Sequence, residues 1–319
     1  MSDDYLWNRS GPPDPEVARL EQLLGPLAHD APLRAVPPRR RRALALGIVV
    51  IAAAAGVVLW LETRARQAAP VAAACDGSAG FHFVARGGQV ACGGRELAAG
   101  VLPVGGVLDT GPHEVEMSIA DIGIAELGAH TRVVLDRSSD AGHHLSIEHG
   151  HMHARVAAPP RLFQVAAATT EVTDLGCEYT IDVDARGAGA VRVAVGLVEL
   201  ATRGGLVIAP AGTRTQILPG QRPGLPVADG ASDALAAAVA RYDAGDSAAL
   251  AELYAAATPR DAITLANLAV VDAAARRGAV ARLAALAPHG YAADAALADP
   301  KILQAWRDAI VDQLAWPER

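Results

Sequence analysis

The chain has 319 residues, a formal net charge of -7 at pH 7, and 51% hydrophobic but only 4% aromatic residues. An acidic chain gives no reason to expect nucleic acid as a partner. The length allows one or two folded units beside an anchoring segment, with cores built mainly from Ala, Val and Leu.

Residues 1–42 are predicted to form a cytoplasmic tail with one short amphipathic helix. Asp14 followed by Pro15 is a typical helix start, and apolar residues then recur at spacings of three and four. These residues are Val17, Leu20, Leu23, Leu24 and Leu27. About ten helical residues are marginal alone in water, so we expect the stripe to bind a membrane surface, a sister chain or a protein partner. The alternative is a tail with only a nascent helix.

Residues 43–61, ALALGIVVIAAAAGVVLWL, contain no charge and no side-chain amide. As a helix this segment would be roughly 28 Å long, close to the hydrocarbon thickness of a bilayer. It is predicted to be a single transmembrane helix, and the four arginines at 39–42 predict that the N-terminus stays in the cytoplasm. The expected location is the bacterial inner membrane, with the later domains in the periplasm. A cleaved signal peptide is the alternative, but the long stretch before the apolar segment argues against it.

After a stalk at 62–80, residues 81–226 show short runs in which apolar and polar residues alternate, broken by Gly, Asp and Pro. Residues 113–119 and 191–195 are examples. Strands at such short intervals predict an all-β unit, either a sandwich or a solenoid. Gly176 and Gly196 fall at strand starts and tight turns, where a positive φ or a close backbone approach is needed.

Four motifs recur through this region: residues 163–165 (FQV), 172–179 (VTDLGCEY), 191–198 (VRVAVGLV) and 218–221 (LPGQ). Together they resemble the core of the FecR-type periplasmic domain, and residues 108–111, 122–128 and 132–135 fit the earlier part of that pattern. The family usually has Thr and Phe where this chain has Cys177 and Tyr179. The resemblance implies a β-rich, solenoid-like envelope domain in a single-pass regulator that relays signals to an extracytoplasmic-function sigma factor.

The chain has three cysteines, Cys75, Cys92 and Cys177. Outside the cytoplasm an oxidising compartment permits a disulfide between Cys75 and Cys92, which would leave Cys177 buried and free. The odd number of cysteines leaves this pairing open. Cys177 is not expected to be a catalytic nucleophile, because the resembled family has Thr at this strand position.

The segment 142–156, GHHLSIEHGHMHARV, is the best candidate for a binding site. On a strand, His149, His151 and His153 would project from one face and bring their imidazoles within reach of one Zn²⁺ or Ni²⁺ ion. His143 or His144 could add a further ligand. The alternative is a solvated strand face that is rich in histidine, which is favoured because no Cys, Asp or Glu completes a clear ligand set.

Catalysis is not expected from any other motif. The chain has no Gly-x-Ser-x-Gly, no His-Glu-x-x-His and no phosphate-binding loop. We therefore expect that the protein is not an enzyme.

Residues 234–319 are predicted to form a helical domain, with Ala-rich segments near 234–243, 246–256, 259–275, 277–287 and 300–315. Thr258-Pro259 and Asp299-Pro300 are typical helix starts. Short helices joined by short turns predict a small bundle or an antiparallel helical repeat.

The predicted fold class is therefore a membrane-anchored chain with one transmembrane helix, an all-β solenoid-like or sandwich-like domain, and an all-α C-terminal domain. The predicted function is non-enzymatic envelope signalling or regulation, with a sigma factor as the partner that the resemblance implies. An envelope scaffold or ligand-binding module is the main alternative. A metal-responsive sensor that uses the His-rich strand is a third.

Overall fold

The computed structural model describes residue 19 and residues 75–77, 79–287 and 291–315. The chain divides into two compact units, Met1–Gln67 and Ala68–Arg319. Of the first unit only Arg19 is described, so the predicted tail helix and the predicted membrane span at 43–61 lie outside the described residues. The elements below all belong to Ala68–Arg319.

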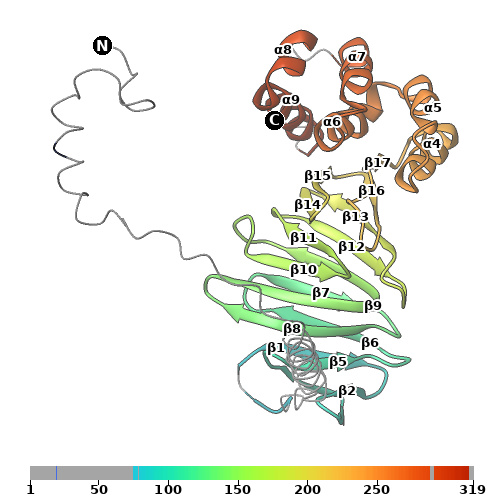
Figure 1. The fold of residues 1–319 in the computed structure, drawn as a ribbon. Coiled ribbons are helices and arrows are strands. Elements are labelled where there is room, and N and C mark those ends of the chain that lie inside the picture. Colours follow the sequence, from blue (N-terminus) through green and yellow to red (C-terminus); the bar gives the residue numbers. More distant parts are fainter. Residues whose placement is uncertain (1–18, 20–74, 78, 288–290, 316–319) are drawn as a thin grey trace, which may run out of the picture. The chain divides into compact units, whose positions relative to one another are not determined.

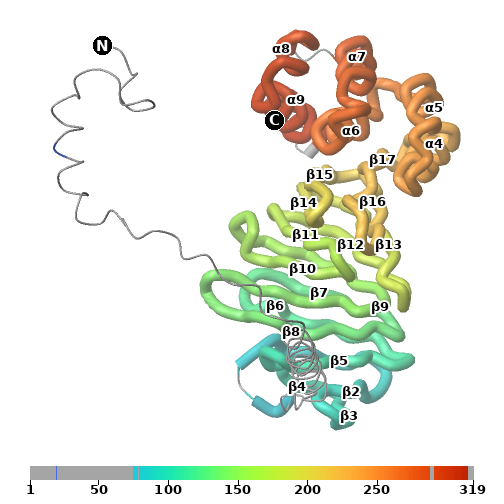
Figure 2. Tube along the Cα trace, viewed as in Figure 1, coloured from blue at the N-terminus to red at the C-terminus, as the bar shows by residue number. Residues whose placement is uncertain are grey.

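Within the described part, the strands form two sheets that share the long strand β9 (Gly142–Val156), as Figures 1 and 2 show. Sheet A consists, in order of pairing, of β4 (Ala99–Leu102), β1 (Phe81–Arg86), β6 (Glu114–Ile119), β7 (Gly123–Leu127), β9, β12 (Glu178–Val183), β13 (Gly189–Val195), β16 (Thr213–Ile217) and β17 (Val227–Ala228). Sheet B consists of β3 (Arg95–Leu97), β2 (Val90–Cys92), β5 (Val107–Asp109), β8 (Arg132–Ser139), β9, β10 (Phe163–Ala167), β11 (Thr170–Asp174), β14 (Leu197–Thr202) and β15 (Gly205–Pro210).

The core lies between the two sheets and follows from the alternation in the sequence. Strand β6 is exposed and buried at alternate residues, with Val115, Met117 and Ile119 inside. Because successive side chains of a strand point to opposite faces, each strand contributes every second residue to the core. Phe81 and Phe163 are among the largest side chains that are fully buried there.

Strand β9 passes from sheet B to sheet A, and Gly150 marks the change. Before Gly150 the odd-numbered residues are buried, such as Leu145 and Ile147, whereas after it the even-numbered residues are buried, such as Met152. Gly150 has a φ of 109°, and an added Cβ would lie 2.3 Å from the side chain of Thr131. Only glycine can take this backbone shape at such a close approach.

The predicted roles of Gly176 and Gly196 are confirmed, and the two glycines lie against each other. Gly176 (φ 93°) lies where the chain crosses from sheet B to sheet A, and Gly196 (φ 76°) lies where it crosses back. A Cβ on Gly196 would lie only 2.2 Å from the carbonyl oxygen of Gly176. Both crossings therefore depend on residues without a side chain.

A disulfide joins Cys75 to Cys92 of β2, the pairing that the sequence left open, and Cys177 is free and buried. The two half-cystines are separated by 17 positions, and the carbonyl oxygen of Cys75 accepts a hydrogen bond from Val101 N–H. Closing a loop of this length in the unfolded chain stabilises the fold by about 3 kcal/mol.

The C-terminal part is helical. Its elements are α4 (Asp233–Asp243), α5 (Ala249–Ala256), the 3₁₀ turn η2 (Pro259–Asp261), α6 (Ala262–Val271), α7 (Arg276–Leu286), α8 (Ala293–Ala298) and α9 (Pro300–Ala315). The single helix predicted over 259–275 is instead η2 and α6, followed by a break at Asp272. The carboxylate of Asp272 accepts hydrogen bonds from Ala274 N–H and Ala275 N–H, so it favours a turn where the alanine-rich pattern favours a helix.

Helices and sheets are joined by buried polar contacts. Asn267 of α6 bonds to the backbone of Ile208 in β15, and the hydroxyl of Thr264 donates to the carbonyl of Pro226 at 2.6 Å. Asp243 at the end of α4 accepts from Arg222 at 2.9 Å and is itself almost fully buried. Because these groups are removed from water, breaking one contact would leave its partner unsatisfied.

The predicted fold class requires correction. No helix within the described ranges is long and apolar enough to cross a bilayer. In place of the predicted transmembrane helix with an all-β solenoid-like or sandwich-like domain, the described residues form a mixed β-sheet domain with a C-terminal helical part. The sheet is mixed because β9 and β10 are parallel, whereas the other strand pairs named above are antiparallel. Alternation along the sequence predicts strands, but it does not specify which strands pair or in which direction.

Candidate functional site

The His-rich segment forms β9, but the three histidines predicted as metal ligands do not lie together. His149 comes before Gly150 and pairs with Arg132 in sheet B. His151 and His153 come after Gly150 and pair with Asp182 and Glu126 in sheet A. The strand therefore changes sheet at the glycine between His149 and His151.

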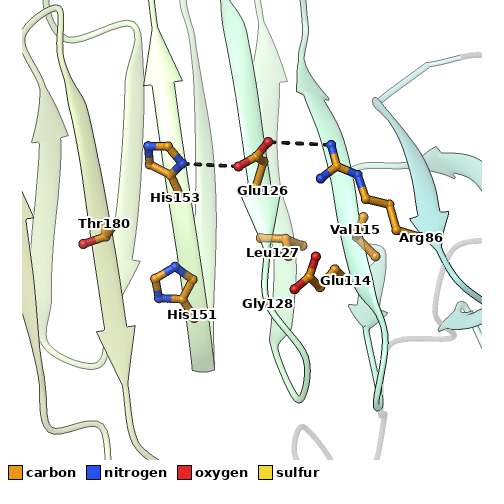
Figure 3. Close-up of a pocket in the computed structure, with 9 residues that line it drawn as sticks. All are labelled: Arg86, Glu114, Val115, Glu126, Leu127, Gly128, His151, His153 and Thr180. Atoms are coloured by element: carbon orange, nitrogen blue, oxygen red, sulfur yellow. Dashed lines mark hydrogen bonds and ion pairs between the residues drawn. The ribbon is translucent and has the colours of Figure 1, made fainter. Parts of the chain in front are cut away.

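His151 and His153 line a shallow pocket of about 270 Å³ on sheet A. Figure 3 shows both rings on one strand, with Glu126 between His153 and Arg86. Thr180 lies on the other side of the histidines. The pocket is therefore bounded by the charged side chains Arg86, Glu114 and Glu126 on one side of the histidines and by Thr180 on the other.

Each of these histidines faces carboxylates of neighbouring strands. His153 Nε2 lies 2.9 Å from Glu178 of β12, and its Nδ1 lies 3.3 Å from Glu126 of β7. His151 Nδ1 lies 2.7 Å from Asp182 of β12. These contacts link three strands across the solvent-facing side of sheet A.

Two arginines complete this network. Arg86 lies 3.6 Å from Glu126 and also forms an ion pair with Glu116, while Arg155 lies 3.4 Å from Glu126. Half of the side-chain surface of each arginine is exposed, so each pair contributes little stability by itself. Acidic and basic side chains therefore alternate on this surface, and neither sign of charge predominates.

The metal prediction gains no support from this geometry. In the portion of the chain that the structure describes, no group of three or more His, Cys, Asp and Glu side chains is placed to hold a metal ion. The nitrogens of His153 point at two carboxylates on opposite sides instead of converging with other ligands on one point. Binding of Zn²⁺ or Ni²⁺ by His149, His151 and His153 stays a prediction.

The sequence analysis missed the acidic partners of β9. Glu126, Glu178 and Asp182 lie 25 to 31 positions away from the histidines that they contact. Each of these acids occupies an outward-facing position in a segment of alternating polarity. The sequence around it therefore predicts exposure but does not indicate which residue it contacts. Pairing that segment with β9 requires knowledge of the sheet order.

A second hollow, of about 670 Å³, lies between sheet B and the helices α6 and α9. Apolar residues such as Leu206, Ile208 and Val271 line part of it. Its charged groups include Glu199, held by Arg161 through contacts of 2.7 and 3.2 Å, and the buried Arg307. We call this hollow the sheet–helix cleft. An apolar lining with a few fixed polar groups is typical of ligand-binding pockets.

Cys177 is placed for structure and not for nucleophilic chemistry. Its thiol donates to Asp174 Oδ2 at 2.6 Å, while Asp174 Oδ1 accepts from Gly176 N–H. Burial raises the pKa of the Cys177 thiol far above its usual range, and the neighbouring Asp174 raises it further. Burial also raises the pKa of Asp174. A thiol kept in its protonated form is a poor nucleophile.

One serine–histidine pair is also structural. Ser138 Oγ lies 2.9 Å from His143 Nδ1, within the range expected for a nucleophile and its base. The His143 ring is buried, however, and lies 5.5 Å from the ring of Phe81, centroid to centroid. Burial lowers the pKa of His143. The buried ring of His143 and the half-buried Ser138 therefore lie away from the pockets described above.

The predicted partner-binding residues Val17, Leu20, Leu23, Leu24 and Leu27 lie outside the described residues. The structure consequently leaves their role as a prediction.

Comparison with known proteins gives a limited result. No family model matches the chain, and no curated protein matches it, so the FecR-type resemblance stays a prediction. Two crystal structures, each of a candidate anti-sigma factor from Parabacteroides distasonis, are similar at 16% and 17% identity with TM-scores of 0.34 and 0.32. The matches cover 38% and 35% of this chain and 59% and 54% of those chains. TM-scores this low do not establish a shared fold.

Proposed function

We propose that this chain is a non-enzymatic regulatory protein that controls a sigma factor. In this proposal the β-sheet and helical parts receive a signal, and the N-terminal segment contacts the sigma factor. The proposal extends to this chain the function that the FecR-type resemblance implies.

The observation that supports it most is the contact between Gly176 and Gly196. Each glycine belongs to one of the motifs that carry the resemblance, 172–179 and 191–198. The motifs are separate in the sequence, yet their glycines meet with a spacing that leaves no room for a Cβ. Two motifs that form one structural junction are a more specific resemblance than two independent short patterns.

The chemistry of the described residues supports a non-enzymatic role. The free thiol of Cys177 is buried with a raised pKa, and His143 is packed in the core. The partly exposed histidines at 151 and 153 are engaged by carboxylates. In each case the group that could act in catalysis is engaged in a contact within the fold.

The disulfide supports a location of the β part in an oxidising compartment outside the cytoplasm. Disulfides such as Cys75–Cys92 persist in secreted and periplasmic proteins and are rare where thiols are kept reduced. We include this location in the proposal.

The test is direct binding of a sigma factor. The full chain is tagged and purified from its own cells, and co-purified sigma factors are identified by mass spectrometry. One of them is then titrated with a peptide of residues 1–38. We expect Leu20→Asp with Leu24→Asp to weaken binding at least tenfold, because burying each leucine contributes roughly 1.5–3 kcal/mol.

The matched control is Arg19→Ala, an exposed helical position in the same segment. It should change binding by less than about threefold, as expected for a surface substitution. If no sigma factor binds the full chain or the peptide, the sigma-factor role is overturned.

A ligand-binding module is the second candidate, and the sheet–helix cleft favours it. The cleft has the volume and the mixed lining of a small-molecule site. Under this alternative, Leu206→Trp, which fills the cleft, would abolish ligand binding and have no effect on any sigma factor.

A further inference from the structure

His144 lies between two carboxylates that come from different strands. Its Nδ1 is 2.9 Å from Asp136 Oδ2 of β8, and its Nε2 is 3.2 Å from Glu171 Oε2 of β11. The side chain is 23% exposed, so the ring is partly removed from water. His144 is thus the centre of a bridge that starts on β8 and ends on β11.

Both contacts can be hydrogen bonds only when the ring carries two protons. A neutral imidazole has one N–H, and an ionised carboxylate can only accept. The imidazolium form donates to both carboxylates at once, and each bond is strengthened by charge. Burial lowers the pKa of His144, but Asp136 and Glu171 outweigh it, and the pKa is raised overall.

The remaining polar neighbours support this arrangement. The Ser146 hydroxyl, two positions along β9, donates to Asp136 Oδ2 at 2.7 Å and so holds that carboxylate toward the ring. Arg137 pairs with His144 across β8 and β9, but its guanidinium donates to Gln164 of β10 at 3.2 Å. The groups around His144 are therefore the carboxylates of Asp136 and Glu171, the hydroxyl of Ser146 and the amide of Gln164. The one cation, Arg137, is directed at that amide.

The bridge crosses the one parallel strand pair named in sheet B. In sheet B, the parallel pair β9–β10 joins the strands before β9 to the strands after it. The bridge spans this pair, because Asp136 lies on its β8 side and Glu171 on its β11 side. A parallel pair is slightly less stable per residue than an antiparallel one, so this junction gains from an added cross-link.

We propose that Asp136, His144 and Glu171 form a proton-operated latch across the β9–β10 junction of sheet B. The protonated ring holds β8 and β11 together, and loss of one proton leaves one of the two carboxylates without its donor. A histidine whose pKa is raised on folding contributes its full stability below its unfolded pKa, about 6.5. That contribution is lost as the pH rises through the folded pKa. The latch does not depend on which partner the protein binds.

The experiment compares the full chain with His144→Gln, and uses His82→Gln, an exposed histidine of β1, as the matched control. Denaturant unfolding is measured from about pH 6 to about pH 8.5, where an unperturbed histidine and one with a raised pKa both titrate. In the parent and in His82→Gln, we expect the folding equilibrium constant to fall about threefold to tenfold more over this range than in His144→Gln. Protection factors of the β10 backbone amides, which are corrected for the intrinsic pH dependence of exchange, should fall between these pH values in the parent and stay level in His144→Gln.

Two further measurements keep the test decisive. Arginine carries its charge throughout this range, so His144→Arg should flatten the pH dependence. An NMR titration of the histidine rings in the parent should show His144 titrating above its ordinary value. The proposal is overturned if His144→Gln keeps the pH dependence of the parent, or if His144 titrates at or below that value.

Discussion

The side-chain amide of Asn267 pairs with the backbone of Ile208 in the way that a neighbouring strand would. Ile208 N–H donates to Asn267 Oδ1 at 2.9 Å, and Asn267 Nδ2 donates to the Ile208 carbonyl at 3.0 Å. Ile208 lies in β15, which pairs with β14 on its other side. One residue of α6 thereby closes the edge of sheet B and fixes the helical part to it, since an open strand edge can pair with other chains.

Replacing Asn267 should therefore destabilise the protein. Asn267→Leu keeps the volume but leaves the partly buried N–H and C=O of Ile208 without their side-chain partners, at a cost of about 2–4 kcal/mol. Denaturant unfolding measures the loss. The exposed Gln313→Leu on α9 should change the free energy of unfolding by less than about 0.5 kcal/mol. Equal effects of the two substitutions would show that the amide does not hold the edge.

The glycine junction gives a second prediction. Gly196→Ala places a methyl group 2.2 Å from the Gly176 carbonyl oxygen and also strains a φ of 76°, so the free energy of unfolding should fall by about 3 kcal/mol or more. Gly212→Ala is the control for the strain alone. Its φ is 70°, and a Cβ there would meet nothing within 4 Å, so the loss should be about 1–2 kcal/mol. Similar losses at both sites would contradict the close contact.

Reduction of the disulfide should lower the stability of the β part. A loop closed between Cys75 and Cys92 is expected to contribute about 3 kcal/mol, so dithiothreitol should lower the melting temperature of the parent. The double variant Cys75→Ser with Cys92→Ser should melt at the reduced value and no longer respond to the reductant. A parent that is unaffected by complete reduction would contradict the expected contribution.

Cys177 should be unreactive until the protein unfolds. Its thiol is buried, bonded to Asp174, and has a pKa raised by burial, so the thiolate that reacts with reagents is not formed near neutral pH. Under non-reducing conditions, titration with a thiol reagent should detect no thiol in the native chain and one in denaturant. Rapid labelling of the native chain would place Cys177 at the surface.

Metal addition tests the predicted role of His149, His151 and His153. Because carboxylates already hold His151 and His153, and Gly150 separates His149 from them, we expect Zn²⁺ or Ni²⁺ to leave the melting temperature of the full chain unchanged. A ligand that binds only the folded state would raise it. A metal-dependent rise that disappears when the three histidines are replaced by alanine would establish the metal site.

Local features of the sequence determined much of the secondary structure. Alternation predicted the strands between residues 81 and 226, because successive side chains of a strand face opposite sides. The change to helical spacing placed the helices after residue 233, and glycine predicted the turns at Gly176 and Gly196. Each of these properties depends on residues that are close in the sequence, so a single segment is enough to reveal it.

The tertiary structure alone decided which residues meet. It brought Glu171 to His144 over 27 positions and Asn267 to Ile208 over 59, and it assigned His149 and His151 to different sheets. It also gave a mixed β-sheet domain where the sequence predicts an all-β solenoid-like or sandwich-like domain. The physical reason is that strand partners and their direction are selected by packing of the whole core, which the period of one strand does not record.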